Sequence, residues 1–503
     1  MSSLSSPFGD GSISLFILVT AAVPLWACGI AIYRLWLSPL AEFPGRKLAA
    51  LTGWYETYFD CMKRGRYWVE IERMHKEYGP IIRISPWELH VNDPEWNEPY
   101  KISSRVNKYH WYYKFVGSSD AAFGTSDHDL HRIRRKAQQG YFTLDAVARF
   151  DPVLDEITSK LSRRLEEFRG TGQPANLSNA FRSLATDVVT KFSFHKAYNL
   201  LDQHDFSAAF QKTLRDFPEI GLWHRHFGLI LDIMDMMPRW MVKIMNPSGI
   251  DVLDFFNDIG NQTKAIIKSY GGAKSGDYGR PNVIHQMLDS PNLPVRDKSE
   301  SRLALEVRTF VGAGTETTGN TLSVTAFHLL ANPEKALKLK EEVQAAQNKS
   351  STSLRPTTDD SPSPQSSLKA YGGTDSRLPR INTREAITYK TYQIPVNTPV
   401  SMTQRLTHYN KTIFPSPETF LPERWLDPSE RRRLEKYLQP FGRGSRACIG
   451  LHLASSELYV TIAMLFGQFD MRLFETEEYD IKQVHDFFSP FPDSERGLRV
   501  TIE

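Results

Sequence analysis

The order of apolar and polar positions divides the chain into one uncharged apolar stretch and a long body of amphipathic segments. Residues 11–33 read GSISLFILVTAAVPLWACGIAIY, without a charged side chain. As a helix this stretch is about 34 Å long, enough to span a bilayer. Between residues 50 and 340 apolar residues recur at helical spacing, as at Leu154, Ile157 and Leu161. The pattern predicts a membrane anchor followed by a mainly helical body; a buried core helix is the alternative for the apolar stretch.

Charges beside the apolar stretch predict its orientation. Residues 1–10 contain no lysine or arginine, whereas Arg34, Arg46 and Lys47 follow the stretch. By the positive-inside rule, we expect residues 1–10 in the lumen and the body of the protein in the cytosol. Residues 34–49 are interrupted by prolines, so they are expected to form a stiff linker between the anchor and the body.

Two further kinds of segment complete the expected fold. Residues 81–91 and 389–402 combine β-branched residues with turn formers, which predicts a few short strands. Residues 344–375 are rich in Ser, Thr and Pro and have almost no large apolar side chains, so we expect them to be disordered. The expected fold class is mainly α with a minor β part, with one large domain over residues 50–503.

Composition excludes several classes of protein. The chain is 41% hydrophobic and 24% charged, with a net charge of +3, as in an ordinary globular protein. It has no basic stripe with interleaved aromatic residues, so we expect no nucleic-acid partner. The three cysteines, Cys28, Cys61 and Cys448, are far apart and odd in number, which favours a reducing compartment over a disulfide framework.

Cys448 stands in a glycine- and arginine-rich turn, FGRGSRACIG (441–450), just before a segment with a helical pattern. Glycine permits positive φ and the close approach of a flat ligand. The N-terminus of the helix and nearby Arg446 would favour the thiolate, the form of cysteine that binds metals. From the cysteine alone two interpretations stay open, an inert buried side chain and a metal ligand.

The ordered pattern F-x-x-G-x-R-x-C-x-G, formed by Phe441, Gly444, Arg446, Cys448 and Gly450, resembles the haem-binding loop of the cytochrome P-450 family. The resemblance implies haem b as cofactor and Cys448 as the axial thiolate ligand of its iron. It also implies that Arg446 binds a haem propionate. Phe441, near the sulfur side of the ring, and Gly444 would complete the cofactor-binding loop.

A second motif lies in the long apolar segment 305–330. Residues 313–318 read AGTETT and resemble the oxygen-activation motif of the same family. The resemblance implies that Thr317 holds a water or the bound oxygen and that Glu316 relays protons. The small residues Gly312 and Gly314 would leave room for dioxygen. A threonine-rich buried helix without this role is the alternative.

Weaker matches extend the resemblance along the chain. Residues 128–143 resemble the family's C-helix, in which His131 and Arg135 would face haem propionates. Arg380, in the run SRLPRI, is expected to bind a propionate as well. Plain surface charge is the alternative for each. Residues 108–115 and 227–245 correspond to the loop over the haem and to the lid region, with core packing as the alternative.

The resemblance implies a fungal haem-thiolate monooxygenase, similar to the trichodiene oxygenase group of secondary metabolism. Residues 50–503 would be its catalytic domain, held at the endoplasmic reticulum membrane. It would hydroxylate or epoxidise a hydrophobic terpenoid- or polyketide-like molecule with O₂ and electrons from NADPH. NADPH–cytochrome P-450 reductase is the implied partner, with cytochrome b5 as a further candidate. A reductase-independent haem-thiolate isomerase or dehydratase is one rival hypothesis, and an inactive remnant is another.

One part of the family pattern is missing. The family carries E-x-x-R on a helix that follows the oxygen helix, and its two side chains bind a later arginine, here Arg424. Residues 331–400 contain no E-x-x-R, and residues 344–375 stand in its place. A buried arginine that loses its partner destabilises a protein by roughly 3–5 kcal/mol. Three explanations stay open: a misplaced splice boundary in the translated sequence, a remnant that binds haem poorly, or substitution by Glu341, Glu342 or another acid.

Overall fold

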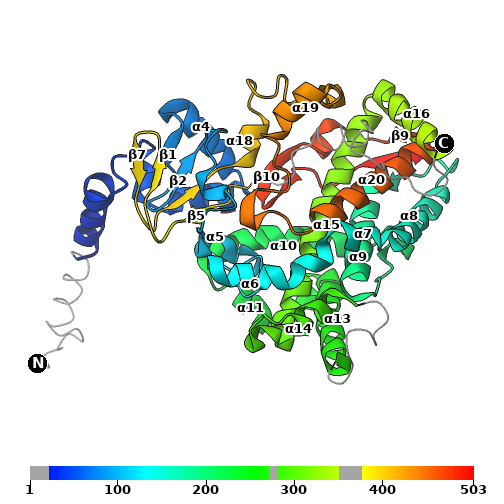
Figure 1. Cartoon of the computed structure of the whole chain (residues 1–503), viewed down its shortest axis with the longest axis horizontal. Coiled ribbons are helices and arrows are strands. Elements are labelled where there is room, and N and C mark those ends of the chain that lie inside the picture. The colour runs from blue at the N-terminus through cyan, green and yellow to red at the C-terminus, as the bar shows by residue number, and fades with distance from the viewer. Residues whose placement is uncertain (1–21, 271–280, 350–375) are drawn as a thin grey trace, which may run out of the picture.

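The computed structural model describes residues 22–270, 281–349 and 376–503 (Figure 1). Helices make up most of these residues, and short strands form small sheets beside them. The prediction of a mainly α fold with a minor β part is therefore confirmed.

The N-terminal stretch is covered only in part. Of the expected anchor, residues 11–21 lie outside the described residues, and residues 22–32 are helical. The helix passes into a π-helical turn, η1 (Tyr33–Leu37), and the linker ends in α2 (Lys47–Leu51). Within the part of the chain that the structure describes, no helix is long and apolar enough to cross a membrane.

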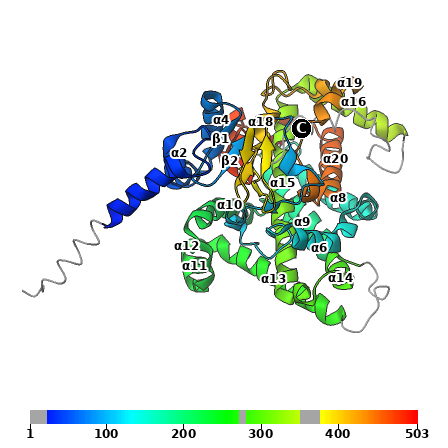
Figure 2. The same ribbon diagram turned by 60° about the vertical axis from the view of Figure 1, so that its left-hand side comes forward.

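The helical body packs around α15 (Glu300–Leu330), a helix of 31 residues that runs through the molecule (Figures 1 and 2). Leu303, Val307 and Leu322 of α15 are fully buried in the largest hydrophobic core. Against it pack α9 (Leu177–Phe194), α13 (Pro247–Tyr270), α16 (Pro333–Lys349) and α20 (Leu451–Gln468). The other helices are α3 (Trp54–Thr57), η2 (Tyr58–Met62), α4 (Tyr67–Tyr78), η3 (Glu98–Tyr100), α5 (His110–Tyr113), η4 (Lys114–Val116), α6 (His128–Gln139), η5 (Gly140–Phe142), α7 (Leu144–Ala148), α8 (Asp151–Glu166), η6 (Leu200–Asp202), α10 (Ala208–Phe227), α11 (Ile230–Met236), α12 (Arg239–Met245), α14 (Val283–Asp289), η7 (Val295–Lys298), α18 (Gln404–His408), η8 (Pro422–Trp425), α19 (Pro428–Glu435), η9 (Gly444–Arg446) and η10 (Glu478–Asp480).

Short strands form the β part. The largest sheet has the order β1-β2-β8-β5-β3 and mixes parallel and antiparallel pairs. The predicted strands in 81–91 and 389–402 are present as β1, β2, β7 and β8. The strands are β1 (Ile81–Arg83), β2 (Leu89–Val91), β3 (Asn107–Lys108), β4 (Ala175–Asn176), β5 (Arg380–Ile381), β6 (Ile387–Tyr389), β7 (Tyr392–Ile394), β8 (Pro399–Ser401), β9 (Met471–Leu473), β10 (Gln483–Phe487), β11 (Ser489–Pro492) and β12 (Arg499–Ile502).

The start of the segment predicted to be disordered is helical. Helix α16 continues to Lys349, so residues 344–349 are helical. Residues 350–375 lie outside the described residues. The chain is described again from Ser376, and it enters the large sheet at β5.

Candidate active site

A cavity of about 660 Å³ lies between α6, α15, the start of α20 and the β10–β11 hairpin. Most residues that the sequence predicted for the site line this one cavity. They are His131, Arg135, Thr317, Arg380, Phe441, Arg446 and Cys448. Glu316 and Gly444 are the two predicted residues that do not line it. The fold thus brings together residues that lie more than three hundred positions apart in the sequence.

The turn around Cys448 presents its thiol to the cavity. The Cys448 amide donates to Phe441 O at 2.8 Å, and Gly442 and Gly444 take positive φ values of 68° and 71°. Helix α20 begins three residues later, with Gly450 as its N-cap. Burial raises the pKa of the Cys448 thiol, and the Gly450 amide and the Arg135 guanidinium lower it in part. The cation that acts on the sulfur is therefore Arg135, not Arg446 as the sequence suggested.

Several basic side chains line the cavity wall, and none of those described next is paired with an acidic side chain. Arg446 donates to Thr125 O at 2.6 Å and to Ser126 O at 2.9 Å, and Arg135 donates to Ala447 O at 2.7 Å. These acceptors are neutral. Burial, together with the neighbouring cation Arg380, lowers the pKa of Arg446 to about 9.

The acid on the wall does not offset this charge. Glu306 lines the cavity, but it accepts from Arg302 Nη2 at 2.7 Å and from the Ala122 amide at 3.1 Å. Among the described residues, Arg446 Nε and His131 Nδ1 are buried and have no hydrogen-bond partner. The cavity therefore presents cations and unused donors to whatever occupies it.

These features fit haem b. A dianionic ligand with two carboxylates would compensate the cations and accept from Arg446 Nε and, in the protonated or Nδ1–H form, from His131. A metal at the sulfur would stabilise the thiolate that burial disfavours. Cys448 would ligate the iron, and Arg446, Arg135, His131 and Arg380 are placed to hold the propionates.

The sequence reasoning missed Lys108. Its side chain lines the same cavity and is 6% exposed, in the segment that the sequence placed over the haem. The buried position of this lysine follows from the pairing of β3 with β5 and cannot be seen from its neighbours in the chain.

The two residues of the expected oxygen motif point in different directions. Thr317 faces the cavity and its Oγ1 donates to Ala313 O at 2.7 Å. Glu316 instead makes a two-pronged ion pair with Arg182 of α9, with distances of 2.8 and 2.9 Å. Gly314 also faces α9, because a Cβ there would lie 3.0 Å from Val189 Cγ2. Gly314 therefore serves helix packing, and the small residue on the cavity wall is Ala313.

The packing of the backbone around residue 444 requires a glycine there. A Cβ at this position would lie 2.2 Å from Tyr100 O, in addition to the strain of its positive φ. The glycine thus permits η9 to lie against η3. Its effect on the cofactor is indirect, through the placement of Arg446 two residues later.

The roof of the cavity includes a strained aromatic residue. Phe488 forms the tip of the β10–β11 hairpin with φ of 75°, a value that costs a bulky residue about 1–3 kcal/mol. The turn is held by its amide, which donates to Asp486 Oδ1 at 2.9 Å, and by Ser376 Oγ, which donates to Phe488 O at 3.3 Å. The Phe488 ring contacts those of Phe115 and Phe123.

The lid region does not pack into the core. Helices α11 and α12 contain no buried residue, and Met236, Trp240, Ile244 and Met245 are largely exposed. Core packing, the alternative weighed for residues 227–245, is therefore wrong for these two helices.

Arg424, the expected partner of the missing E-x-x-R, has a neutral contact. Its Nη2 donates to Ser416 O at 3.1 Å. Within the described ranges, neither Glu341 nor Glu342 pairs with it, and Glu342 Oε2 is buried without a partner. Substitution by these two acids is therefore absent from the described part of the chain.

The molecule is a mainly helical body around one long helix, with a cysteine that faces a basic cavity suited to haem. Residues 57–490 match the family model of cytochrome P-450. The chain belongs to the cytochrome P-450 family.

Curated relatives match nearly the whole chain. A cytochrome P-450 monooxygenase of Ascocoryne sarcoides is 37% identical over 511 residues, which cover 98% of this chain and 99% of that protein. A tryptophan 6-hydroxylase of Fusarium equiseti is 35% identical, with 94% of each chain covered. An N-acetyltryptophan 6-hydroxylase of Emericella nidulans is 32% identical, with 100% and 99% covered. The chain is accordingly a cytochrome P-450 monooxygenase of the kind found in fungal secondary metabolism.

Proposed function

We propose that this monooxygenase hydroxylates or epoxidises a hydrophobic secondary metabolite, with O₂ and with electrons that a reductase delivers from NADPH. The observation that carries the proposal is the position of Cys448 in a cavity whose other walls include Phe123, Phe310, Leu378 and Phe488. Such walls bind apolar or aromatic molecules and offer few polar groups to orient them. Terpenoid- and polyketide-like molecules fit this description. The two relatives named for tryptophan substrates add indoles to the candidates.

Haem, when bound, supplies the oxygen chemistry. The chain's own contribution is to hold the cofactor, exclude water and deliver protons. The Thr317 hydroxyl would hold a water at the cavity wall, since it lies there and already makes one hydrogen bond. In the described pairing, Glu316 faces α9 and its carboxylate is held by Arg182. Glu316 would therefore supply protons only after its carboxylate leaves Arg182. A proton relay of this kind contributes about 10²–10⁴-fold to a rate.

The same proposal places the protein at the endoplasmic reticulum membrane with its catalytic domain in the cytosol. Exposed apolar side chains are found on α3, η2, α11 and α12, and the rings of Trp54 and Phe227 lie 6.1 Å apart between these groups. Figure 2 shows α11 and α12 on the side from which the N-terminal helix extends. A large exposed apolar surface beside an apolar helix suits contact with lipid.

The decisive experiment is the spectrum of the reduced, CO-bound protein. We expect the red-shifted Soret band of thiolate-ligated haem in the wild type and its loss in Cys448→Ser. Absence of the band from wild-type protein would favour an inactive remnant, the second candidate, which Arg424 supports because its one described contact is neutral. Sequencing the transcript across residues 340–380 then separates a remnant from a misplaced splice boundary.

A reductase-independent isomerase or dehydratase is separated from the proposed monooxygenase by electron use. A monooxygenase consumes NADPH in step with product, and Glu316→Gln should uncouple the two. An isomerase would form product without NADPH. Product formed at full rate without any reductant would contradict the proposed function.

A further inference from the structure

A buried asparagine, Asn320, lies on α15 three residues after Thr317. Its side chain is 5% exposed and lines the cavity that contains Cys448. Asparagine is a poor helix former, and a buried amide is unfavourable unless its polar atoms are hydrogen-bonded. The presence of Asn320 inside a buried helix is therefore explained by the partners of its amide.

Both polar atoms of the Asn320 amide bond to the β10–β11 hairpin. Nδ2 donates to Pro490 O of β11 at 3.2 Å, and Oδ1 accepts from Gln483 Nε2 of β10 at 3.2 Å. Gln483 Nε2 also donates to Ile481 O at 2.8 Å. Because the carbonyl oxygens of Pro490 and Ile481 can only accept, these contacts fix the orientation of both amides. One side chain of α15 thus holds both strands of the hairpin.

The hairpin depends on such contacts because its own ladder is short. Among the described residues, β10 and β11 pair only with each other, and Pro490 and Pro492 of β11 have no amide hydrogen to donate. A hairpin of two strands is only marginally stable by itself. Away from α15 it is held by a small apolar core, in which Phe487 and Phe491 pack with Leu222 of α10.

The position of the hairpin determines how much room the cavity offers. Phe488, Ser489 and Pro490 line the cavity from the hairpin, and Thr317 and Asn320 line it from α15. The cavity of about 660 Å³ has to hold haem together with the substrate, so little space is left for a bulky molecule. Movement of the hairpin away from α15 would enlarge this space, and it would break both hydrogen bonds of the Asn320 amide.

We propose that Asn320 is a positioning residue that fixes the β10–β11 hairpin against α15, and that it thereby limits the size of the substrate that fits beneath Phe488. The inference rests on the proposed function, since it concerns a substrate bound in the cavity beside haem. Asn320 takes no part in the bond-forming step. Its effect is on the space around the substrate, through the backbone of Pro490 and the side chain of Gln483.

The test compares a small and a bulky ligand that both bind to the haem iron of the holoprotein through an imidazole nitrogen. The ligands are imidazole and clotrimazole, a triaryl imidazole, and the Soret shift gives each Kd. Asn320→Leu should bind clotrimazole about tenfold more tightly than wild type, because the roof can move without breaking hydrogen bonds. Its Kd for imidazole should change by less than about twofold, since a small ligand needs no such movement.

Ser323→Ala is the matched control on the same helix. Ser323 is buried and accepts from Ser178 Oγ of α9 at 3.0 Å, so this variant also loses a buried contact, but not one to the hairpin. The ratio of the two Kd values should stay at the wild-type value. An equal change of the ratio in Ser323→Ala and Asn320→Leu would show general loosening of α15 and would overturn the positioning role.

A second variant tests the path through which Asn320 acts. Gln483→Leu removes one of the two hydrogen bonds, so it should change the ratio of Kd values in the same direction by about threefold. The double variant should match Asn320→Leu, because Gln483 acts on α15 through the same amide. Multiplied effects in the double variant would overturn this path. Should Asn320→Leu fail to fold, Gln483→Leu decides by itself, and an unchanged ratio there overturns the proposal.

Failure of this inference differs from failure of the proposed function. Unchanged or weaker clotrimazole binding in Asn320→Leu, with normal haem content, overturns the positioning role and leaves the proposed function standing. If wild-type protein lacks the Soret band of thiolate-ligated haem, both are overturned.

Discussion

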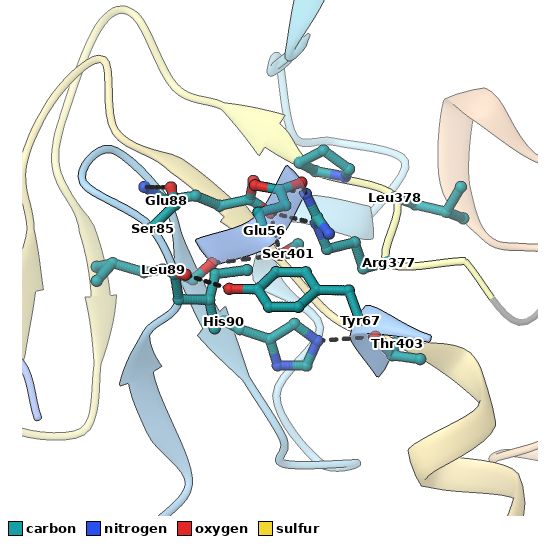
Figure 3. A network of polar contacts seen from close by, with 12 residues as sticks. Glu56, Tyr67, Ser85, Glu88, Leu89, His90, Arg377, Leu378, Ser401 and Thr403 are labelled. Carbon is teal, nitrogen blue, oxygen red and sulfur yellow. Dashed lines mark hydrogen bonds and ion pairs between the residues drawn. The ribbon is translucent and has the colours of Figure 1, made fainter. Parts of the chain in front are cut away.

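Arg377 and Arg380 lie close together in the chain, but their side chains have opposite electrostatic surroundings. Arg377 is held between two buried carboxylates: Nε donates to Glu88 Oε1 at 3.0 Å, and Nη2 pairs with Glu56 (Figure 3). Glu88 also accepts from Ser401 Oγ at 2.6 Å. Arg380, in contrast, has neutral acceptors and faces Lys108.

Counter-charges distinguish a cation that holds segments of the chain together from one that is open to a ligand. Where the protein provides its own counter-charges, as around Arg377, the cation ties segments together and its site is complete. Where the acceptors are neutral, as around Arg380, the charge of the cation is available to a bound anion. Breaking a complete buried pair is strongly destabilising, whereas removing an uncompensated charge is not.

The largest expected effect is on stability at Arg377. Arg377→Met should lower the free energy of unfolding by about 3–5 kcal/mol, because Glu56 and Glu88 would stay buried without a cation. Urea unfolding followed by circular dichroism measures this. Arg384→Gln is the control, since Arg384 is exposed and lies 3.6 Å from exposed Asp129. Equal stability of Arg377→Met and Arg384→Gln would show that the buried carboxylates do not depend on the charge of Arg377.

A third buried cluster contains two histidines whose ring nitrogens are hydrogen-bonded without an ion pair. His75 Nδ1 lies 2.8 Å from Gly79 O, His75 Nε2 lies 2.7 Å from His90 Nδ1, and His90 Nε2 lies 2.9 Å from Thr403 Oγ1. Burial lowers the pKa of His75 to about 4 and that of His90 well below its ordinary value. Both rings are therefore neutral in the folded protein.

This neutrality makes the cluster sensitive to acid. In the unfolded chain these histidines bind protons near pH 6.5. Their contribution to the free energy of unfolding is therefore complete above that pH and is lost as the pH falls toward 4. For His75 alone the loss is about 3 kcal/mol. His75→Gln should unfold with a weaker dependence on pH than wild type over this window. Identical slopes for His75→Gln and wild type would contradict the prediction.

A smaller effect is expected from displacing the loop that carries Arg446. Gly444→Ala should destabilise the protein by about 1–3 kcal/mol through its positive φ, and further through the contact with Tyr100 O. Gly442→Ala is a matched control, because its φ is similarly positive but its nearest foreign atom is 3.8 Å away. Haem retention should fall more in Gly444→Ala. Equal behaviour of the two variants would remove the close approach as an explanation.

The smallest expected effect on stability is at Arg380. In the haem-free protein, Arg380→Met should change the free energy of unfolding by less than about 1 kcal/mol or raise it, because an uncompensated buried charge is replaced by an apolar side chain of similar length. Haem loss from the holoprotein should nevertheless be faster. Destabilisation as large as in Arg377→Met would show that the two arginines have the same role.

Much of this molecule follows from the sequence because its strongest patterns are local. The Cys448 turn, the long α15 helix and the strands in 81–91 are each set by neighbouring residues, and the structure confirms the helix and the strands. Seven of the residues that the sequence predicted for the site line one cavity, since the family pattern orders them along the chain.

The remainder depends on contacts through space. Lys108 enters the cavity because β3 pairs with β5, across more than 270 residues. Glu316 faces α9 because successive helix residues point about 100° apart, so it cannot share the direction of Thr317. Gly444 is fixed by the backbone of Tyr100, which lies far away in the chain. Such placements need the tertiary packing, which no local pattern contains.

The left-handed backbone at Phe488 has a consequence for how the chamber can change. Glycine or asparagine adopts that conformation more easily, so either replacement would relax the hairpin tip while removing an aromatic ring from the roof. At most positions in a core, a substitution that makes room for a bulkier ligand lowers the stability of the fold. Here the relief of backbone strain offsets part of the stability that is lost with the ring contacts to Phe115 and Phe123, so the chamber can be enlarged at the hairpin tip with a smaller loss of stability than elsewhere.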